Sequence, residues 1–314
     1  ILNNNGYVQI FPEGNHNNQK KLRPIKKGIA RIGFGAAEKS SFLKPYYIVP
    51  VGLDYSNHTK MGASLLINIS KPINLADYYS KYKTDIPGTI NKLMAEVKTK
   101  MESLIVNIQS ENYTTYTRLI WILNDQINSN SLKNCLLNQQ ALVATIENLE
   151  SSNKPSFDEL QEQTDFVFSY LNTNKIRPVH LYKKNSTTTA LMSLFMLTIS
   201  FPIHVVGLFS NYLPYKIPEA IVKNKIKDEH FHSSIKMSLG VILFIFFWTL
   251  QSLLFLGFFG IEYALFYIIS LPILAMFNYR WMITLKKTKG LINAIKVCKS
   301  AKHQKARRNY ALLT

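Results

Sequence analysis

The first part of the chain shows short apolar runs around one helical stretch. Tyr7–Phe11 is rich in β-forming residues, and Tyr46–Leu53 and Ser64–Ile69 are two further apolar runs that predict strands. Because Tyr46–Leu53 is mostly apolar, β-branched or aromatic, we expect a strand buried on both faces. Pro24–Ala37 has apolar residues at three- and four-residue steps, which predicts a helix. Strand, helix and strand at this spacing predict an α/β layer.

The pattern becomes helical from Asp77 to about Leu171. One face of a predicted helix repeats apolar residues with the helical period, at Leu93, Val97, Met101, Leu104 and Ile108. Pro155 follows a polar linker and is expected to open another short helix. This region is either a packing module or a cap that faces the substrate.

Two long apolar runs follow, Met237–Leu256 and Ile261–Phe277, joined by the turn Gly257–Gly260. A run of about 20 residues crosses a hydrocarbon core of about 30 Å at about 1.5 Å per residue. Lys236 and Arg280 flank the pair on one side, so the positive-inside rule predicts a helical hairpin with both outer ends cytoplasmic. We therefore expect an integral protein at the cytoplasmic face of a membrane.

Thr189–Leu213 is also apolar, but Pro202 and His204 interrupt its middle. Three full crossings would place the end of the chain and residues 1–185 on opposite faces of the membrane. We therefore interpret this segment as re-entrant or interfacial rather than spanning.

Charge is distributed unevenly along the chain. The net charge is +18, and residues 280–314 carry ten Lys and Arg side chains and no acidic ones. A basic amphipathic tail beside a membrane span predicts binding to anionic lipids. Nucleic acid is the rival partner, and it is not expected because the tail lacks interleaved aromatic residues, with Tyr310 alone. The two cysteines, Cys135 and Cys298, exclude a disulfide scaffold and indicate a reducing compartment.

The run Phe11-Pro12-Glu13-Gly14 lies between the first predicted strand and the helix. A glycine lets a ligand approach the backbone closely, and the glutamate can orient a cation or accept a substrate hydroxyl. A cluster of cations follows, at Lys20, Lys21, Arg23, Lys26 and Lys27. Together with a nearby helix start, these residues predict an anion site.

The order and spacing of three motifs resemble the glycerolipid acyltransferase family. Phe11–Gly14 matches its third sequence block, Ile25–Gly28 its Lys-x-Gly continuation, and Ile48–Val51 its fourth block, associated with the acyl donor. Pro214–Ser234 and the hydrophobic hairpin more loosely resemble a long membrane-anchored subgroup, similar to glycerol-3-phosphate and dihydroxyacetone-phosphate acyltransferases.

The resemblance implies a function and a set of residues. The implied reaction moves a fatty acyl group from acyl-CoA or acyl carrier protein to glycerol 3-phosphate or 1-acylglycerol 3-phosphate, with no other cofactor and no metal. The implied acceptor site is Phe11, Pro12, Glu13, Gly14, Asn15, Arg23, Lys26 and Gly28. The implied donor region is Val49, Pro50 and Val51.

The sequence departs from the family pattern in two places. Asn15-His16 stand where many members have Thr-Arg, so Arg23 or Lys20 is expected to replace the missing phosphate-binding arginine. None of the seven histidines is followed five residues later by Asp, so the family's catalytic His-x-x-x-x-Asp is not in this sequence. We expect that motif in an N-terminal part ahead of Ile1, and we assign no catalytic residue here. His230 and His232 have no suitably spaced third ligand for a metal.

We therefore expect the C-terminal part of an acyltransferase α/β domain, then a helical region and a transmembrane hairpin. The expected divisions are 1–76 for the acyltransferase part, 77–186 for the helical accessory region, 187–279 for the membrane region with its hairpin at 237–279, and 280–314 for the basic tail. The alternative function is a non-catalytic membrane-surface scaffold with a lipid-binding tail.

Overall fold

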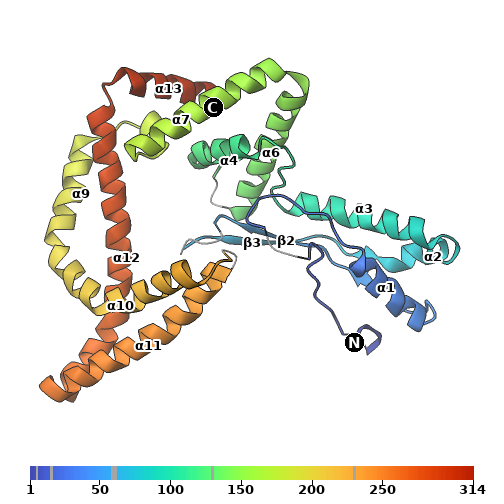
Figure 1. Cartoon of the computed structure of the whole chain (residues 1–314), viewed down its shortest axis with the longest axis horizontal. Coiled ribbons are helices and arrows are strands. Elements are labelled where there is room, and N and C mark those ends of the chain that lie inside the picture. The colour runs from blue at the N-terminus through green and yellow to red at the C-terminus, as the bar shows by residue number, and fades with distance from the viewer. Residues whose placement is uncertain (5, 15–16, 58–61, 129–130, 229–230) are drawn as a thin grey trace. The chain divides into compact units, whose positions relative to one another are not determined.

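The structure is a computed structural model of the 314-residue chain. It describes all residues except 5, 15, 16, 58–61, 129, 130, 229 and 230. Most of the described residues are helical, and the strands are short. The chain divides into two compact units, Ile1–Glu159 and Leu160–Thr314. Figure 1 labels the elements of both units.

The N-terminal segment contains a short 3-10 helix, Leu2–Asn4, and then irregular chain up to helix α1, Gly28–Lys39. The helix predicted over Pro24–Ala37 is confirmed, with a later start. The strand predicted at Tyr7–Phe11 is wrong, because no strand among the described residues pairs with it and Tyr7 is 94% exposed. A segment of β-forming residues that has no neighbouring strand cannot form the hydrogen-bonded ladder of a sheet.

The run Tyr46–Leu53 forms two short strands instead of one. Strand β1, Tyr47–Ile48, ends before Pro50, and strand β2, Val51–Tyr55, begins after it. Pro50 has no N–H to donate to a ladder, although its carbonyl accepts a hydrogen bond from the Ser70 N–H at 3.0 Å.

The two pairs of strands are both antiparallel. β1 pairs with β4, Ile73–Asn74, and β2 pairs with β3, Leu65–Ile69, so the strand predicted at Ser64–Ile69 is confirmed. The prediction of burial on both faces is wrong: Gly52 is buried, whereas Val51 and Leu53 are each 41% exposed. The predicted α/β class is therefore matched only in part, because the sheets are two-stranded and helices dominate.

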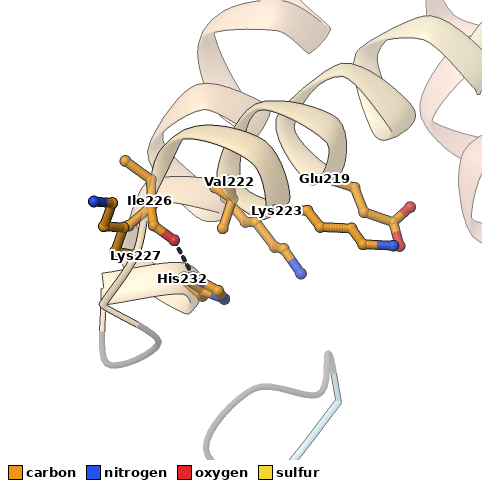
Figure 2. Close-up of a pocket in the computed structure, with 7 residues that line it drawn as sticks. Glu219, Val222, Lys223, Ile226, Lys227 and His232 are labelled. Carbon is orange, nitrogen blue, oxygen red and sulfur yellow. Dashed lines mark hydrogen bonds between the residues drawn. The ribbon is translucent and has the colours of Figure 1, made fainter.

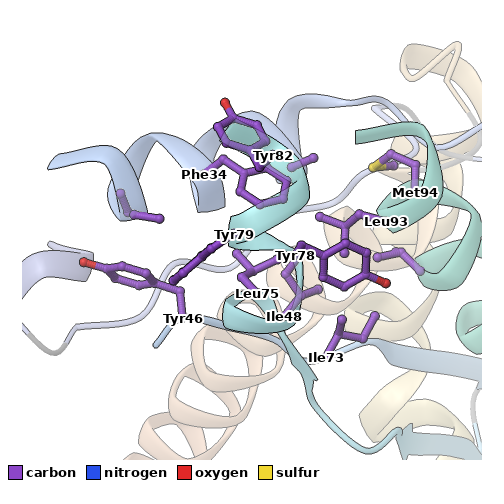
Figure 3. Packing of buried hydrophobic residues seen from close by; sticks show 14 residues of the cluster. Phe34, Tyr46, Ile48, Ile73, Leu75, Tyr78, Tyr79, Tyr82, Leu93 and Met94 are labelled. Carbon is purple, nitrogen blue, oxygen red and sulfur yellow. The ribbon is translucent and has the colours of Figure 1, made fainter. Parts of the chain in front are cut away.

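A core of buried side chains joins α1 to three following elements. These are the 3-10 helix Leu75–Tyr78 and helices α2, Tyr79–Thr84, and α3, Ile86–Leu104. The ring of Tyr82 stacks on that of Phe34 with 4.0 Å between centroids. Figure 3 shows the cluster, with the labelled members Phe34, Tyr46, Ile48, Ile73, Leu75, Tyr78, Tyr79, Tyr82, Leu93 and Met94.

Helix α3 follows from local sequence signals. The Asp85 side chain accepts a hydrogen bond from the Gly88 N–H at 2.9 Å and caps the helix, and a proline occupies its first turn. Leu93, Val97 and Leu104 of the predicted apolar face are buried. Ile108 is buried too, but it lies beyond the helix end.

The remaining helices of the first unit are α4, Tyr113–Ile122, α5, Asn124–Ile127, and α6, Leu132–Ser152. The Glu150 carboxylate joins α6 to the start of α4, because it accepts hydrogen bonds from the Tyr116 hydroxyl at 2.5 Å and the Asn112 amide at 2.6 Å. Helix α7, Lys154–Asn174, begins where Pro155 predicts a helix start but is 21 residues long rather than short.

The second unit contains α8, Val179–Tyr182, α9, Thr187–Ile199, α10, Phe201–Lys225, α11, His232–Phe259, α12, Ile261–Val297, and α13, Ala301–Leu313. By length and composition, α11 and α12 can each cross a membrane, and they meet at Gly260 as the predicted hairpin requires. Helices α9 and α10 are bent by 57° at their junction and together form a third apolar segment, either a broken span or a re-entrant loop.

Polar side chains connect α10, α11 and α12 between their apolar surfaces. Trp248 donates its indole N–H to the Asn211 amide oxygen at 2.9 Å. Gln251 donates to the Ser210 carbonyl at 3.0 Å and accepts from the Tyr267 hydroxyl at 2.8 Å. In hydrocarbon such groups must find partners within the protein, so these bonds set how the three helices lie along one another.

The predicted basic tail is not one helix. Its first half continues α12 to Val297, and its second half is α13. One face of α13 is buried: His303 hydrogen bonds the Tyr170 hydroxyl at 3.0 Å, and Arg307 donates to the Leu181 carbonyl at 2.9 Å. The proposed divisions of the chain remain predictions.

The core predicts a clear contrast between two leucines. Leu93→Ala, in the fully buried cluster, should lower the free energy of unfolding by about 2–5 kcal/mol, because it leaves a cavity. Leu137→Ala, on the exposed side of α6, should change it by less than about 0.5 kcal/mol. Pulse proteolysis of the full chain in urea and detergent measures both, and equal effects would contradict the assigned core.

Candidate functional site

The site begins at a tight turn, Phe11–Gly14. The Gly14 N–H donates to the Phe11 carbonyl at 3.2 Å, and Gly14 has a φ of +79°, which side-chain-bearing residues rarely adopt. The chain then returns to this turn at Lys26, whose N–H donates to the Pro12 carbonyl at 2.9 Å. The turn and the start of α1 are therefore held together by backbone.

A second hydrogen bond comes from the glutamate of the motif. Glu13 accepts the backbone N–H of Arg23 on its Oε2 at 3.1 Å, across ten residues of sequence. The sequence predicts that Glu13 orients a cation, and in the structure it holds the backbone of one. The backbone of Arg23 is thereby held at the turn, as that of Lys26 is.

The Lys26 side chain lies over Gly14. A Cβ built at Gly14 would lie 2.5 Å from the Lys26 Nζ and 2.7 Å from its Cε, so a side chain at position 14 is incompatible with this arrangement. Gly28, by contrast, has open space around its Cβ position and begins α1. The result is an ammonium group, an exposed glycine backbone and a helix start in one place, which is suited to an anion.

The structure separates Lys20 from the other cations. The Lys20 ammonium forms an ion pair with Asp54 of β2 at 2.6 Å, and both side chains are largely buried. Its backbone N–H donates to the Tyr113 hydroxyl at 2.7 Å, and its carbonyl accepts from Ile108 at 2.8 Å. Lys20 thus connects β2 and α4 to the motif through its ion pair and backbone, and the expectation that Lys20 or Arg23 replaces the arginine of the family stays a prediction.

Sequence reasoning missed the partners of Lys20. Asp54 is 34 residues from Lys20, and Tyr113 is 93 residues away. No local spacing links them, although the position of Asp54 in a run of apolar residues is a signal of a paired charge. Asn107 is a further missed residue, since its side-chain oxygen accepts the Leu22 N–H at 2.8 Å.

The predicted donor residues lie on a different element. Pro50 is buried between β1 and β2, whereas Val49 is 48% exposed. Val51 lies opposite Ile69 in the β2–β3 ladder, and Leu53 lies opposite Ile67. These four ladder residues are all exposed and share one face of the hairpin, which forms an apolar strip. The Lys20–Asp54 ion pair connects this hairpin to the motif.

Two predicted positions, Asn15 and His16, lie outside the described residues. Phe11 is 68% exposed and contributes its carbonyl to the turn. Within the described part of the chain, no three His, Cys, Asp or Glu side chains gather as metal ligands.

Comparison with known proteins supports the motif. Residues 1–54 match the sequence model of the acyltransferase family, and every predicted site residue lies in that range. The chain is also 31% identical over 107 residues to glycerol-3-phosphate O-acyltransferase 2 of Saccharomyces cerevisiae. That alignment covers 34% of this chain and 14% of the yeast protein. No solved structure matches the chain.

These matches and the Phe11–Gly28 motif indicate the class of protein that this segment resembles, the acyltransferases. Both matches agree with the resemblance to glycerolipid acyltransferases that the motifs indicate, and they cover part of the chain.

The contact between Gly14 and Lys26 leads to a prediction for Gly14, with Gly28 as the control. Gly14→Ala should displace Lys26 and strain the turn by about 1–2 kcal/mol, because alanine disfavours a positive φ. Hydrogen exchange at the Lys26 amide, which bonds to Pro12, should accelerate about ten-fold. Gly28→Ala should leave that exchange rate unchanged. Equal rates in the two variants would contradict the proposed packing.

Proposed function

We propose that this chain forms part of an enzyme that transfers a fatty acyl group to the hydroxyl of glycerol 3-phosphate or 1-acylglycerol 3-phosphate. The donor would be acyl-CoA or an acyl carrier protein. The observation that carries this proposal is the return of the chain at Arg23–Lys26 to the turn Phe11–Gly14. This return places the Lys26 ammonium against the Gly14 backbone, within the segment that matches the acyltransferase family.

In this proposal the acceptor's phosphate binds beside Lys26 and the start of α1. Ammonium and guanidinium groups form charge-assisted hydrogen bonds with phosphate oxygens, and α1 adds the partial positive end of its dipole. Glu13 has acceptor capacity beyond its bond to Arg23, and it would accept a glycerol hydroxyl. The site would thus fix the position of the reacting hydroxyl, which is a proximity effect.

The apolar strip on the β2–β3 hairpin supports a role toward the acyl donor. Val51, Leu53, Ile67 and Ile69 present hydrocarbon on one face, and the fatty acyl chain of a thioester would lie along it. Burial of such a chain contributes about 0.8 kcal/mol per CH₂ group.

The chemical step needs a general base, and we assign this role to no residue of this chain. A base takes the proton of the acceptor hydroxyl, the oxygen attacks the thioester carbonyl, and the thiolate leaves. No histidine here stands five residues before an aspartate, so the described residues are given binding roles. The matched segment covers 14% of the yeast protein. That a whole protein containing this chain catalyses acyl transfer is therefore part of the proposal.

Location at a membrane fits a lipid-forming reaction. α11 and α12 can span a bilayer, and Lys236 and Arg280 at their outer ends support the cytoplasmic face for the rest of the chain. The alternative, a non-catalytic scaffold, shares these membrane features and differs in having no acyl transfer.

Glu13→Ala should lower acyl transfer at least about ten-fold, because it releases Arg23 and removes the hydroxyl acceptor. Membrane association should stay unchanged. The assay uses washed membranes carrying the longest reading frame that contains this sequence, with glycerol 3-phosphate and its 1-acyl form offered side by side. Exposed Glu111→Ala is the matched control. An unchanged rate in Glu13→Ala would reject its role, and no transfer by the unaltered protein would favour the scaffold.

The tail predicts a salt-sensitive attraction to anionic lipids. Replacing the exposed Lys299, Lys302 and Arg308 by Gln keeps the buried face of α13 and removes three charges. Binding to vesicles that contain phosphatidylserine should weaken, by up to about 1 kcal/mol per charge, and more at low salt. Flotation measures it, with the exposed Lys39, Lys92 and Lys133 to Gln as control. Equal effects of the two sets would contradict this role.

A further inference from the structure

A cavity of about 410 Å³ lies between the end of α10 and the start of α11. Figure 2 shows residues that line it, including Lys223 of α10, Lys227 just after α10 and His232 of α11. Lys236 lines it as well. This cavity belongs to the second unit and is separate from the acyltransferase motif, which belongs to the first.

The charge of the cavity is positive. Lys223, Lys227 and Lys236 line it, and the acidic residue in its lining is Glu219. The Glu219 carboxylate is already engaged, because the Lys216 ammonium lies 2.8 Å from its Oε2. Three ammonium groups therefore face a single carboxylate, which acts on Lys223 and Lys236 but is hydrogen bonded to Lys216, and the net positive charge of the described lining suits an anionic ligand.

His232, the first residue of α11, connects the two helix ends that border the cavity. Its Nε2 lies 2.9 Å from the carbonyl of Ile226, the residue that ends α10, and donates a hydrogen bond to it. This bond holds the start of a 28-residue helix against the lysines of α10. The partial positive charge of that helix end adds to the three ammonium groups.

The depth of the cavity follows from the register of the two helices. Asn211 of α10 and Trp248 of α11 are hydrogen bonded, and Trp248 lies near the middle of the apolar run. Lys223 is twelve residues beyond Asn211, and Lys236 is twelve residues before Trp248, so each lies about 18 Å along its helix from that bond. Half of a hydrocarbon core is about 15 Å, which puts both lysines at the level of lipid headgroups.

We propose that this cavity binds the phosphate group of an anionic glycerophospholipid from the surrounding leaflet. Exposed apolar side chains follow its lining residues along both helices, Ile221 on α10 and Met237 and Val241 on α11, and the acyl chains would lie along them. A soluble phosphate ester offers the same charge but gains nothing from this apolar surface. The inference does not depend on the acyl-transfer proposal.

The test uses the full chain in nanodiscs of phosphatidylcholine with a small fraction of phosphatidic acid. Native mass spectrometry of the released protein measures the affinity for the first bound phosphatidic acid. Lys223→Gln with Lys236→Gln should weaken it at least ten-fold. The control pair, Lys225→Gln with Lys92→Gln, removes the same charge outside the cavity and should change it less than two-fold.

A double variant that conserves the charge distinguishes loss of binding from misfolding. Lys223→Arg with Lys236→Arg should bind phosphatidic acid within three-fold of the unaltered chain, because arginine also binds phosphate. Failure of this pair to bind would overturn the proposal.

Three further outcomes would overturn it. One is equal weakening by the cavity pair and the control pair, which would indicate general surface charge. Another is phosphatidylcholine bound as tightly as phosphatidic acid. The third is displacement of the lipid by an equal concentration of glycerol 3-phosphate, which would assign the cavity to a soluble phosphate ester.

Discussion

The candidate site depends on the return of the chain at Arg23–Lys26 to the turn at Phe11–Gly14. Two hydrogen bonds make this closure, from the Lys26 N–H to the Pro12 carbonyl and from the Arg23 N–H to the Glu13 carboxylate. The Lys26 ammonium can then lie on Gly14 only because no Cβ occupies that space. A glutamate, a glycine and a lysine that are separated in the sequence are thus brought together at one turn.

The apolar helices of the second unit depend on a different constraint. Polar groups among apolar helices must find partners inside the protein, and Asn211, Trp248, Gln251 and Tyr267 do so across α10, α11 and α12. These bonds fix the register of the helices. The register in turn determines how far the lysines at the helix ends lie from the middle of the apolar runs.

Sequence patterns predicted the elements whose causes are local. The apolar period and the Asp85 cap of α3, and the two long apolar runs of α11 and α12, are confirmed. Predictions failed where a partner decides the outcome: Tyr7–Phe11 has β-forming residues but no paired strand among the described residues. At Tyr46–Leu53, Pro50 divides the strand and an open face replaces two-sided burial.

The motif, the order of its residues and its resemblance to the acyltransferases were determined by the sequence alone, because they are properties of covalent order. The tertiary structure decided how the two candidate cations differ. Lys20 and Arg23 are equivalent candidates in the sequence, yet Lys20 is bound to Asp54 of β2 and Arg23 is held by Glu13. Lysine and arginine have similar charge along a chain, and only the folded chain brings a distant carboxylate to one of them.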